Sequence, residues 1–280
     1  MIIAHLMHDT RDLLACSLTS RSWYIAAVPQ LRLTLTIPIN RPYEETEWSE
    51  PLRTGFKLGL LPFVTRVFIV WNTWGVFSSE KFHHRIRQEF STLANVQELS
   101  IDNLGLPSFM PRIQEYFGQF PPTLQSLTLR KPVGTCRQLV FFIGLFPHLE
   151  DLELHDYLPN PVGDPTLVPP SVPSLRGRLT ASNFHGGDLA RTIVDLLGGL
   201  RFRHTDLSNV AGTQFLLYGC GNALETLKLQ ATDICGEYFL RETCQLWPTI
   251  LQACSPGISI FPETSLFRHS KLRHIPSFAH

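Results

Sequence analysis

The sequence lacks the features that mark secreted, membrane-spanning and strongly charged proteins. Its six cysteines form no CxxC pair and no Asn begins an N-x-Ser/Thr sequon, so we expect reduced thiols in a cytoplasmic or nuclear protein. The longest apolar run, Leu139 to Phe146, is too short to span a bilayer, and the N-terminus lacks the order of a secretory signal. The 24 basic and 24 acidic residues cancel, which predicts no nucleic-acid or membrane partner.

Motifs for common catalytic chemistry are also missing. The patterns GxGxxG, GxxxxGK[ST], HExxH and GxSxG do not occur. His83 is followed by His84, and His155 by Asp156, but neighbours in a strand point to opposite faces and cannot chelate an ion together. We therefore predict a protein that is not an enzyme and that has no cofactor and no metal site.

What the sequence does contain is a repeated apolar signature: an apolar residue, two variable positions, an apolar residue, one variable position and an apolar residue. The first three copies start 28 (96 to 124) and 25 (124 to 149) residues apart, and the fourth starts 75 residues further on (149 to 224), which is room for three units of 25. This spacing is in the leucine-rich-repeat range. The copies are Val96/Leu99/Ile101, Leu124/Leu127/Leu129, Leu149/Leu152/Leu154 and Leu224/Leu227/Leu229, with a weaker one at Val64/Val67/Ile69.

Amphipathic segments lie between these signatures, as expected if each strand is followed by a loop and a helix. They are centred on Ile86 to Leu93, Ile113 to Phe120, Leu139 to Phe146, Leu189 to Leu197 and Phe215 to Tyr218. Strands joined by helices must be parallel, and such crossovers are nearly always right-handed. The predicted fold class is therefore α/β, with a right-handed leucine-rich-repeat solenoid of parallel strands alternating with helices.

The domain organisation follows from proline and helical patterning. We predict a short helical module at 1–30, a linker at 31–57 and a repeat domain at 58–280. Six of the 21 prolines lie within 157–174, which predicts a long surface loop there. Degenerate repeats are expected near Leu175 and from Phe202 to Leu207, and a last strand near Leu272 and Ile275.

The opening residues resemble an F-box, especially DLLACSLTSRSW at Asp12 to Trp23: an Asp-Leu-Leu start, a Leu four residues later and a Trp that closes the helix. The segments FFIGLFPHLEDLEL and LANVQELSIDNL resemble the repeats of fungal F-box proteins with leucine-rich repeats. The order of the two resemblances, box first and repeats second, adds specificity.

This resemblance implies a substrate receptor of a cullin–RING ubiquitin ligase. The box would bind a small Skp-type adaptor, and the repeats would hold the protein to be ubiquitinated. The residues that the resemblance assigns to the adaptor contact are Leu13, Leu14, Leu18 and Trp23. Two alternatives stay open. In the first, these side chains cap the first repeat, since solenoids require caps. In the second, the chain is a repeat-only interaction scaffold without a ligase.

Strand periodicity predicts the target-binding surface, because residues that alternate with the buried leucines face the open side of the sheet. Acidic strands on both sides of Arg130 suit a partner with a basic segment, although ordinary solvated sheet surface is the alternative for any single residue. The predicted surface comprises Arg66, Phe68, Glu98, Asp102, Arg130, Asp151, Glu153, His155 and Lys228.

Overall fold

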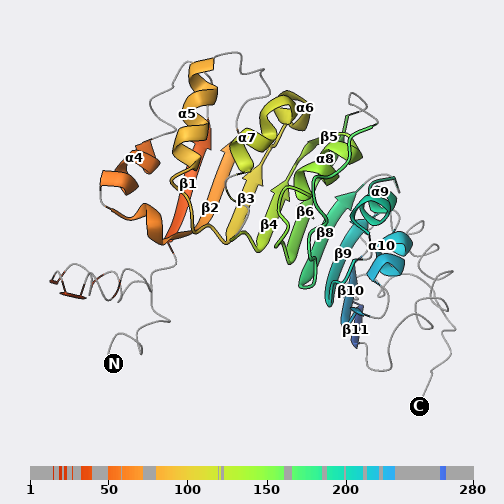
Figure 1. Ribbon diagram of the computed structural model, residues 1–280. Coiled ribbons are helices and arrows are strands. Elements are labelled where there is room, and N and C mark those ends of the chain that lie inside the picture. The colour runs from red at the N-terminus through yellow and green to blue at the C-terminus, as the bar shows by residue number, and fades with distance from the viewer. Residues whose placement is uncertain are drawn as a thin grey trace, which may run out of the picture.

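The structure is a computed structural model, and the residues it describes form an open α/β arch. They are residues 15, 19–20, 22–23, 27, 33–39, 50–57, 59–71, 80–118, 120, 123–160, 166–184, 188–198, 200–210, 213–220, 223–230 and 259–262. Nine strands form one sheet in the order β1-β2-β3-β4-β6-β8-β9-β10-β11. Every pairing in it is parallel, and Figure 1 shows the strands side by side in chain order. The strands are β1 (Leu33–Ile39), β2 (Val64–Trp71), β3 (Glu98–Asp102), β4 (Ser126–Arg130), β6 (Asp151–His155), β8 (Arg178–Phe184), β9 (His204–Val210), β10 (Thr226–Gln230) and β11 (Ser259–Pro262).

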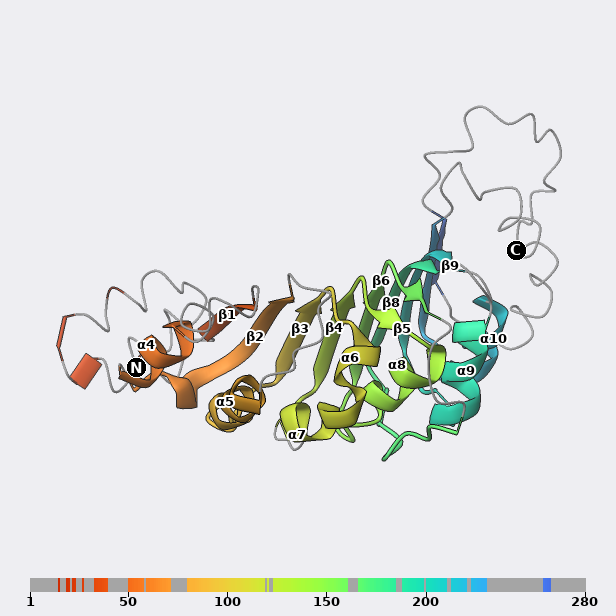
Figure 2. The same cartoon turned by 90° about the horizontal axis from the view of Figure 1, so that it is seen from above.

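Helices cover one face of this sheet and leave the other face open. In Figures 1 and 2 the helices from α5 to α10 lie along the outer side of the arch, and the opposite face lines its inner, concave side. The helices are α4 (Glu50–Lys57), α5 (Glu80–Phe90), α6 (Leu106–Phe109), α7 (Ile113–Phe117), α8 (Cys136–Ile143), α9 (Asp188–Leu197) and α10 (Thr213–Cys220), with the 3₁₀ turns η2 (Leu61–Phe63) and η3 (Met110–Arg112). The strand–helix alternation predicted from the sequence is therefore present.

The core lies between the sheet and the helices, and equivalent residues of successive repeats stack in it. Leu99 is in register with Leu127, Leu127 with Leu152, and Leu152 with Leu179. All four side chains are buried, and so are Leu129 and Leu154, which lie two residues after Leu127 and Leu152. A strand places alternate side chains on opposite faces, so burying one set exposes the other. Strands β8 and β9 fill the gap between β6 and β10, so the two degenerate repeats are confirmed as strands.

Aromatic rings connect the helices along the outer layer. The ring centroids of Phe90 and Phe117 lie 5.9 Å apart, those of Phe117 and Phe142 5.0 Å, and those of Phe142 and Phe146 5.4 Å. Each of these four side chains is fully buried. Aromatic pairs at such distances add to the stabilisation from burial alone, so α5, α7 and α8 pack on one another as well as on the sheet.

Successive strands end in the same backbone turn. The residues directly after β3, β4 and β6 have positive φ: Asn103 (61°), Lys131 (50°) and Asp156 (53°). Asn183 (56°) has the same conformation one residue before the end of β8. Backbone N–H groups in this turn bond to the next repeat, from Asn103 to the carbonyl of Arg130 and from Lys131 to that of His155. The chain then continues into the two-stranded sheet of β5 (Val133–Gly134) and β7 (Leu158–Pro159). The common turn keeps the repeats in register.

Two described parts of the predicted linker over 31–57 are regular structure instead: β1 pairs with β2 along its whole length, and α4 spans residues 50–57. Leu and Thr alternate in β1, which is a strand pattern without the three-residue apolar signature. Pro38 cannot donate a backbone hydrogen bond, but β1 is the edge of the sheet, where a missing N–H is tolerated. Helix α6 was also not predicted.

Other predictions fall partly outside the described residues. Residues 166–174 of the proline-rich segment contain neither helix nor strand, as expected, while its Leu158 and Pro159 form β7. The strand expected near Leu272 and Ile275 lies outside the described residues; the last described strand is β11. No helix in the described ranges is both long enough and apolar enough to cross a membrane.

Candidate functional site

The open face of the sheet presents three parallel rows of side chains. In the first row, Arg66 faces Glu98, Glu98 faces Ser126, and Ser126 faces Asp151. In the second row, Phe68 precedes Ser100, Thr128 and Glu153. In the third row, Val70 precedes Asp102, Arg130 and His155. These residues are at least partly exposed, so the register places the predicted surface residues of β2 to β6 together on one face, and Lys228 lies on the same face of β10.

An ion pair lies within the first row. Arg66 Nε lies 2.7 Å from Glu98 Oε2, and each side chain is 43% exposed. The pair joins β2 to β3 across the sheet. Exposed ion pairs contribute little to folding, about 0–1 kcal/mol, so its main effect is to hold two charged groups in fixed positions on the surface.

A hydrogen-bonded network crosses the middle of the face. Thr128 donates to Glu153 Oε2 at 3.1 Å, His155 Nε2 lies 3.8 Å from the same oxygen, and His155 Nδ1 is hydrogen-bonded to Ser182 Oγ at 2.8 Å. Interaction with His155, together with the Thr128 hydroxyl and the charge of Arg130, lowers the pKa of Glu153 below its usual value, against the opposing effect of burial. The Glu153 carboxylate is thus ionised at neutral pH.

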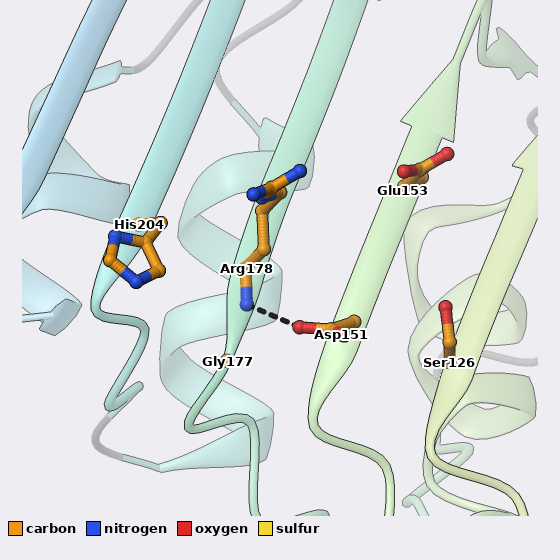
Figure 3. Close-up of a pocket in the computed structure, with 6 residues that line it drawn as sticks. All are labelled: Ser126, Asp151, Glu153, Gly177, Arg178 and His204. Atoms are coloured by element: carbon orange, nitrogen blue, oxygen red, sulfur yellow. Dashed lines mark hydrogen bonds between the residues drawn. The ribbon is translucent and has the colours of Figure 1, made fainter. Parts of the chain in front are cut away.

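A pocket of about 290 Å³ lies beside this network, and Figure 3 shows it. Its lining comes from four strands and the turn before β8: Ser126, Asp151, Glu153, Gly177, Arg178 and His204. Arg178 stands between His204 on one side and the two carboxylates of β6 on the other (Figure 3). The pocket therefore has an acidic wall and a basic wall.

Local backbone geometry fixes the position of Asp151. Its Oδ1 accepts a hydrogen bond from the backbone N–H of Arg178 at 2.6 Å. Gly177 makes this contact possible, because a Cβ at residue 177 would lie 2.1 Å from the same oxygen. Neither Gly177 nor Arg178 was predicted as part of this surface.

Residues of β8 and β9 were missed as members of the surface. Arg178 is in register with His204, and His204 Nδ1 is hydrogen-bonded to Thr226 Oγ1 at 2.8 Å. These strands lack the full apolar signature, since Ala181 and Thr205 stand at buried positions. Counting one residue to either side of each buried position would have found the exposed ones.

The predicted adaptor-binding residues are not brought together by the described part of the chain. Leu13, Leu14 and Leu18 lie outside the described residues. Trp23 is partly buried and helical, and its backbone N–H donates to Ser20 Oγ at 3.3 Å.

Neither a metal-binding group nor a match to a known protein assigns a role to this surface. Within the described ranges, no group of three or more His, Cys, Asp or Glu side chains is placed to hold a metal ion. The sequence matches no family model, and no curated protein or solved structure matches it. The open face therefore has to be interpreted from its own geometry.

Proposed function

We propose that this protein is a non-enzymatic, substrate-recruiting adaptor of an SCF-type ubiquitin ligase. Its F-box-like segment at 1–30 would bind a Skp-type adaptor, and a leucine-rich-repeat solenoid would hold the target protein on its open face. The proposal places the protein in the cytoplasm or nucleus, where such ligases act. It combines the resemblance of Asp12 to Trp23 to an F-box with the repeat architecture of the rest of the chain.

The repeating register is the observation that carries the proposal. Residues paired across neighbouring strands from β3 to β10 (Leu99, Leu127, Leu152, Leu179, Thr205 and Leu227) are 22 to 28 residues apart in the chain. A unit of this length, one strand with a return segment on the outer side, is the size of a leucine-rich repeat. Such solenoids expose an extended concave surface that suits protein binding.

The polar network on the open face favours binding over catalysis. His155 is bonded to Ser182, the pairing that a nucleophile and its base would need. However, Glu153 Oε2 lies 3.8 Å from His155 Nε2, and this distance is longer than the hydrogen bond that orients a catalytic base. The same oxygen already accepts a hydrogen bond from the Thr128 hydroxyl. We therefore assign these groups to hydrogen bonding with a bound protein.

The proposed mechanism is proximity. With one end on the ligase and a target on the sheet, the protein would raise the effective concentration of target lysines near a ubiquitin-charged enzyme, and no bond would be made or broken on this chain. The two binding events would use separate parts of the sequence, so each should be removable without the other.

Titration of the intact chain with a Skp-type adaptor tests the proposal. We expect binding, its loss in the double variant Leu14→Asp/Leu18→Asp, and its retention in Leu158→Asp, which introduces a charge at an exposed leucine of the repeat region. Failure of the intact, folded chain to bind would reject the ligase role and favour the alternative, a leucine-rich-repeat interaction scaffold without ubiquitin-ligase association.

A further inference from the structure

Arginines cluster where the chain enters β8 and β9. Of the three residues that precede each strand of the main sheet from β3 to β10, arginine occurs only before these two strands, at Arg176, Arg201 and Arg203. The equivalent residues before β3, β4, β6 and β10 include neither arginine nor lysine. Arg178, the first residue of β8, completes the cluster. We call these four residues the arginine edge.

Backbone hydrogen bonds hold the two segments of the arginine edge together. The N–H of Arg201 donates to the carbonyl oxygen of Leu175 at 3.3 Å, and the N–H of Arg203 donates to that of Gly177 at 3.0 Å. Figure 1 shows β8 and β9 side by side. All four arginine side chains are exposed. Four positive charges therefore gather on two neighbouring repeats of a chain whose formal net charge is zero.

Most of this charge is not neutralised by the described part of the chain. Arg203 Nε lies 3.7 Å from Glu225 Oε1, and the two side chains are 62% and 57% exposed, so this ion pair is weak. The guanidinium groups of Arg176, Arg178 and Arg201 form no ion pair with any described residue. The arginine edge can therefore bind anionic groups of another molecule.

Acidic residues limit the arginine edge on both sides. Gly177 donates its backbone N–H to the carbonyl oxygen of Glu150 at 3.1 Å, and Glu225 donates its own to that of Arg203 at 2.7 Å. Both glutamates are exposed, and Asp151 lies beside Glu150. Neighbouring strands are about 4.8 Å apart, so the positive stretch is two strands, or about 10 Å, wide.

The side-chain chemistry and the width together specify a ligand. A guanidinium group binds a carboxylate through two parallel hydrogen bonds, and arginine clusters are a recurrent means of recognising acidic segments. An extended segment advances about 3.3 Å per residue, so about three residues cross the edge. We propose that the arginine edge binds a short run of about three Asp or Glu residues in the target protein.

The flanking carboxylates favour a protein segment over a nucleic acid. The negative charge of a nucleic acid continues without interruption along its backbone, so beyond the arginine edge it would meet Glu150 and Asp151 on one side or Glu225 on the other. A protein segment can place neutral or basic residues there. The basic partner segment expected from the strands around Arg130 concerns earlier repeats, so the two expectations apply to different parts of the arch.

This inference rests on the proposed function, because it specifies the target segment that the repeats would hold. Labelled Gly/Ser peptides of about ten residues provide the probes. The acidic peptide has three glutamates at its centre, and two controls have three glutamines or three lysines there. An oligothymidylate of about the same length tests the nucleic-acid alternative. Fluorescence anisotropy with the full chain measures the affinities.

We expect the acidic peptide to bind at least about tenfold more tightly than the glutamine peptide, equivalent to about 1.4 kcal/mol. Raising the salt from about 0.15 M to about 1 M should remove most of this difference, because the Debye length falls from about 8 Å to about 3 Å. The lysine peptide and the oligothymidylate should both bind more weakly than the acidic peptide.

Paired arginine variants locate the binding. Arg176→Gln/Arg201→Gln should lose at least about fivefold in affinity for the acidic peptide. Its urea unfolding should match that of the unchanged chain, because neither guanidinium group has an ion-pair partner in the described residues. Arg53→Gln/Arg87→Gln removes the same charge from exposed arginines of α4 and α5 and should bind like the unchanged chain.

Equal binding of the acidic and glutamine peptides, tighter binding of the lysine peptide or the oligothymidylate, or equal affinities of the two double variants would overturn the inference. The same preparations are titrated with the Skp-type adaptor. Retained adaptor binding without a preference for the acidic peptide rejects the arginine-edge inference and leaves the ligase role standing. Lost adaptor binding by an intact chain that still prefers the acidic peptide rejects the ligase role alone.

Discussion

Asp151 Oδ1 lies 2.6 Å from the backbone nitrogen of Arg178, one strand away. The bond spans two repeats, and it directs the carboxylate into the space that a side chain at residue 177 would occupy. The acidic wall of the pocket and the backbone of the neighbouring strand are therefore fixed together.

Replacing Gly177 tests this arrangement. In Gly177→Ala the new Cβ would lie 2.1 Å from Asp151 Oδ1 and 3.2 Å from the carbonyl oxygen of Glu150, so the carboxylate or the backbone must move. We expect a loss of about 1–3 kcal/mol in the free energy of unfolding, measured by urea denaturation. Gly105→Ala is the control, since no atom lies within 4 Å of its Cβ. Equal stability of the two variants would contradict the proposed role of Gly177.

Truncation of a central leucine tests the stacked core. Leu127 is 0% exposed and has Leu99 and Leu152 as its register partners. Leu127→Ala should lower the free energy of unfolding by about 2–5 kcal/mol, because the cavity cannot fully collapse between two fixed strands. Leu158→Ala removes the same group from a residue that is 46% exposed and should cost far less. Thermal and urea unfolding of both variants measure the difference.

The capping box of α8 offers a local test. Thr135 Oγ1 accepts the backbone N–H of Gln138 at 3.1 Å, and Gln138 Oε1 accepts that of Thr135 at 2.9 Å. Thr135→Ala should reduce the free energy of unfolding by about 1 kcal/mol, because helical N–H groups lose their acceptor. Thr135→Ser keeps the hydroxyl and should retain most of the stability. A serine variant as unstable as the alanine variant would argue against the capping bond.

Glu153 should make stability depend on pH in the acid range. Its pKa is lowered in the folded protein, by His155 first, so the unfolded chain binds more protons at this site and stability rises with pH there. The contribution is complete above the ordinary Glu pKa of about 4.3 and disappears as pH falls through the lower folded value. Urea unfolding of Glu153→Gln from pH 7 to pH 3 should show a smaller dependence than the unchanged chain. An identical dependence would show that Glu153 is not the responsible group.

The sequence predicts the central strands well and the edges poorly. Strands β3, β4 and β6 each belong to a copy of the apolar signature, and its three apolar residues are buried between the sheet and the helices. Periodicity alone therefore identifies these strands. Strand β1 escaped prediction because a Leu–Thr alternation with Pro38 is acceptable only where one side of the strand is unpaired, and sequence alone does not say which strand is the edge.

The pocket could be predicted only in part. Asp151 and Glu153 follow from strand alternation in β6. Arg178 and His204 depend on how β8 and β9 align with β6, and that alignment is set by the turn at Gly177 and by Leu179 packing beside Leu152. Both are tertiary contacts between degenerate repeats, which no local pattern specifies.

Hydrogen exchange of the intact chain, with and without a Skp-type adaptor, tests most directly whether ligase binding and target binding use separate parts of this protein. We predict that the adaptor slows exchange within residues 1–30 and leaves the amides of β3, β4 and β6 unchanged. Slower exchange confined to the open strands, or no change anywhere in a folded chain with the adaptor at saturating concentration, would contradict the account.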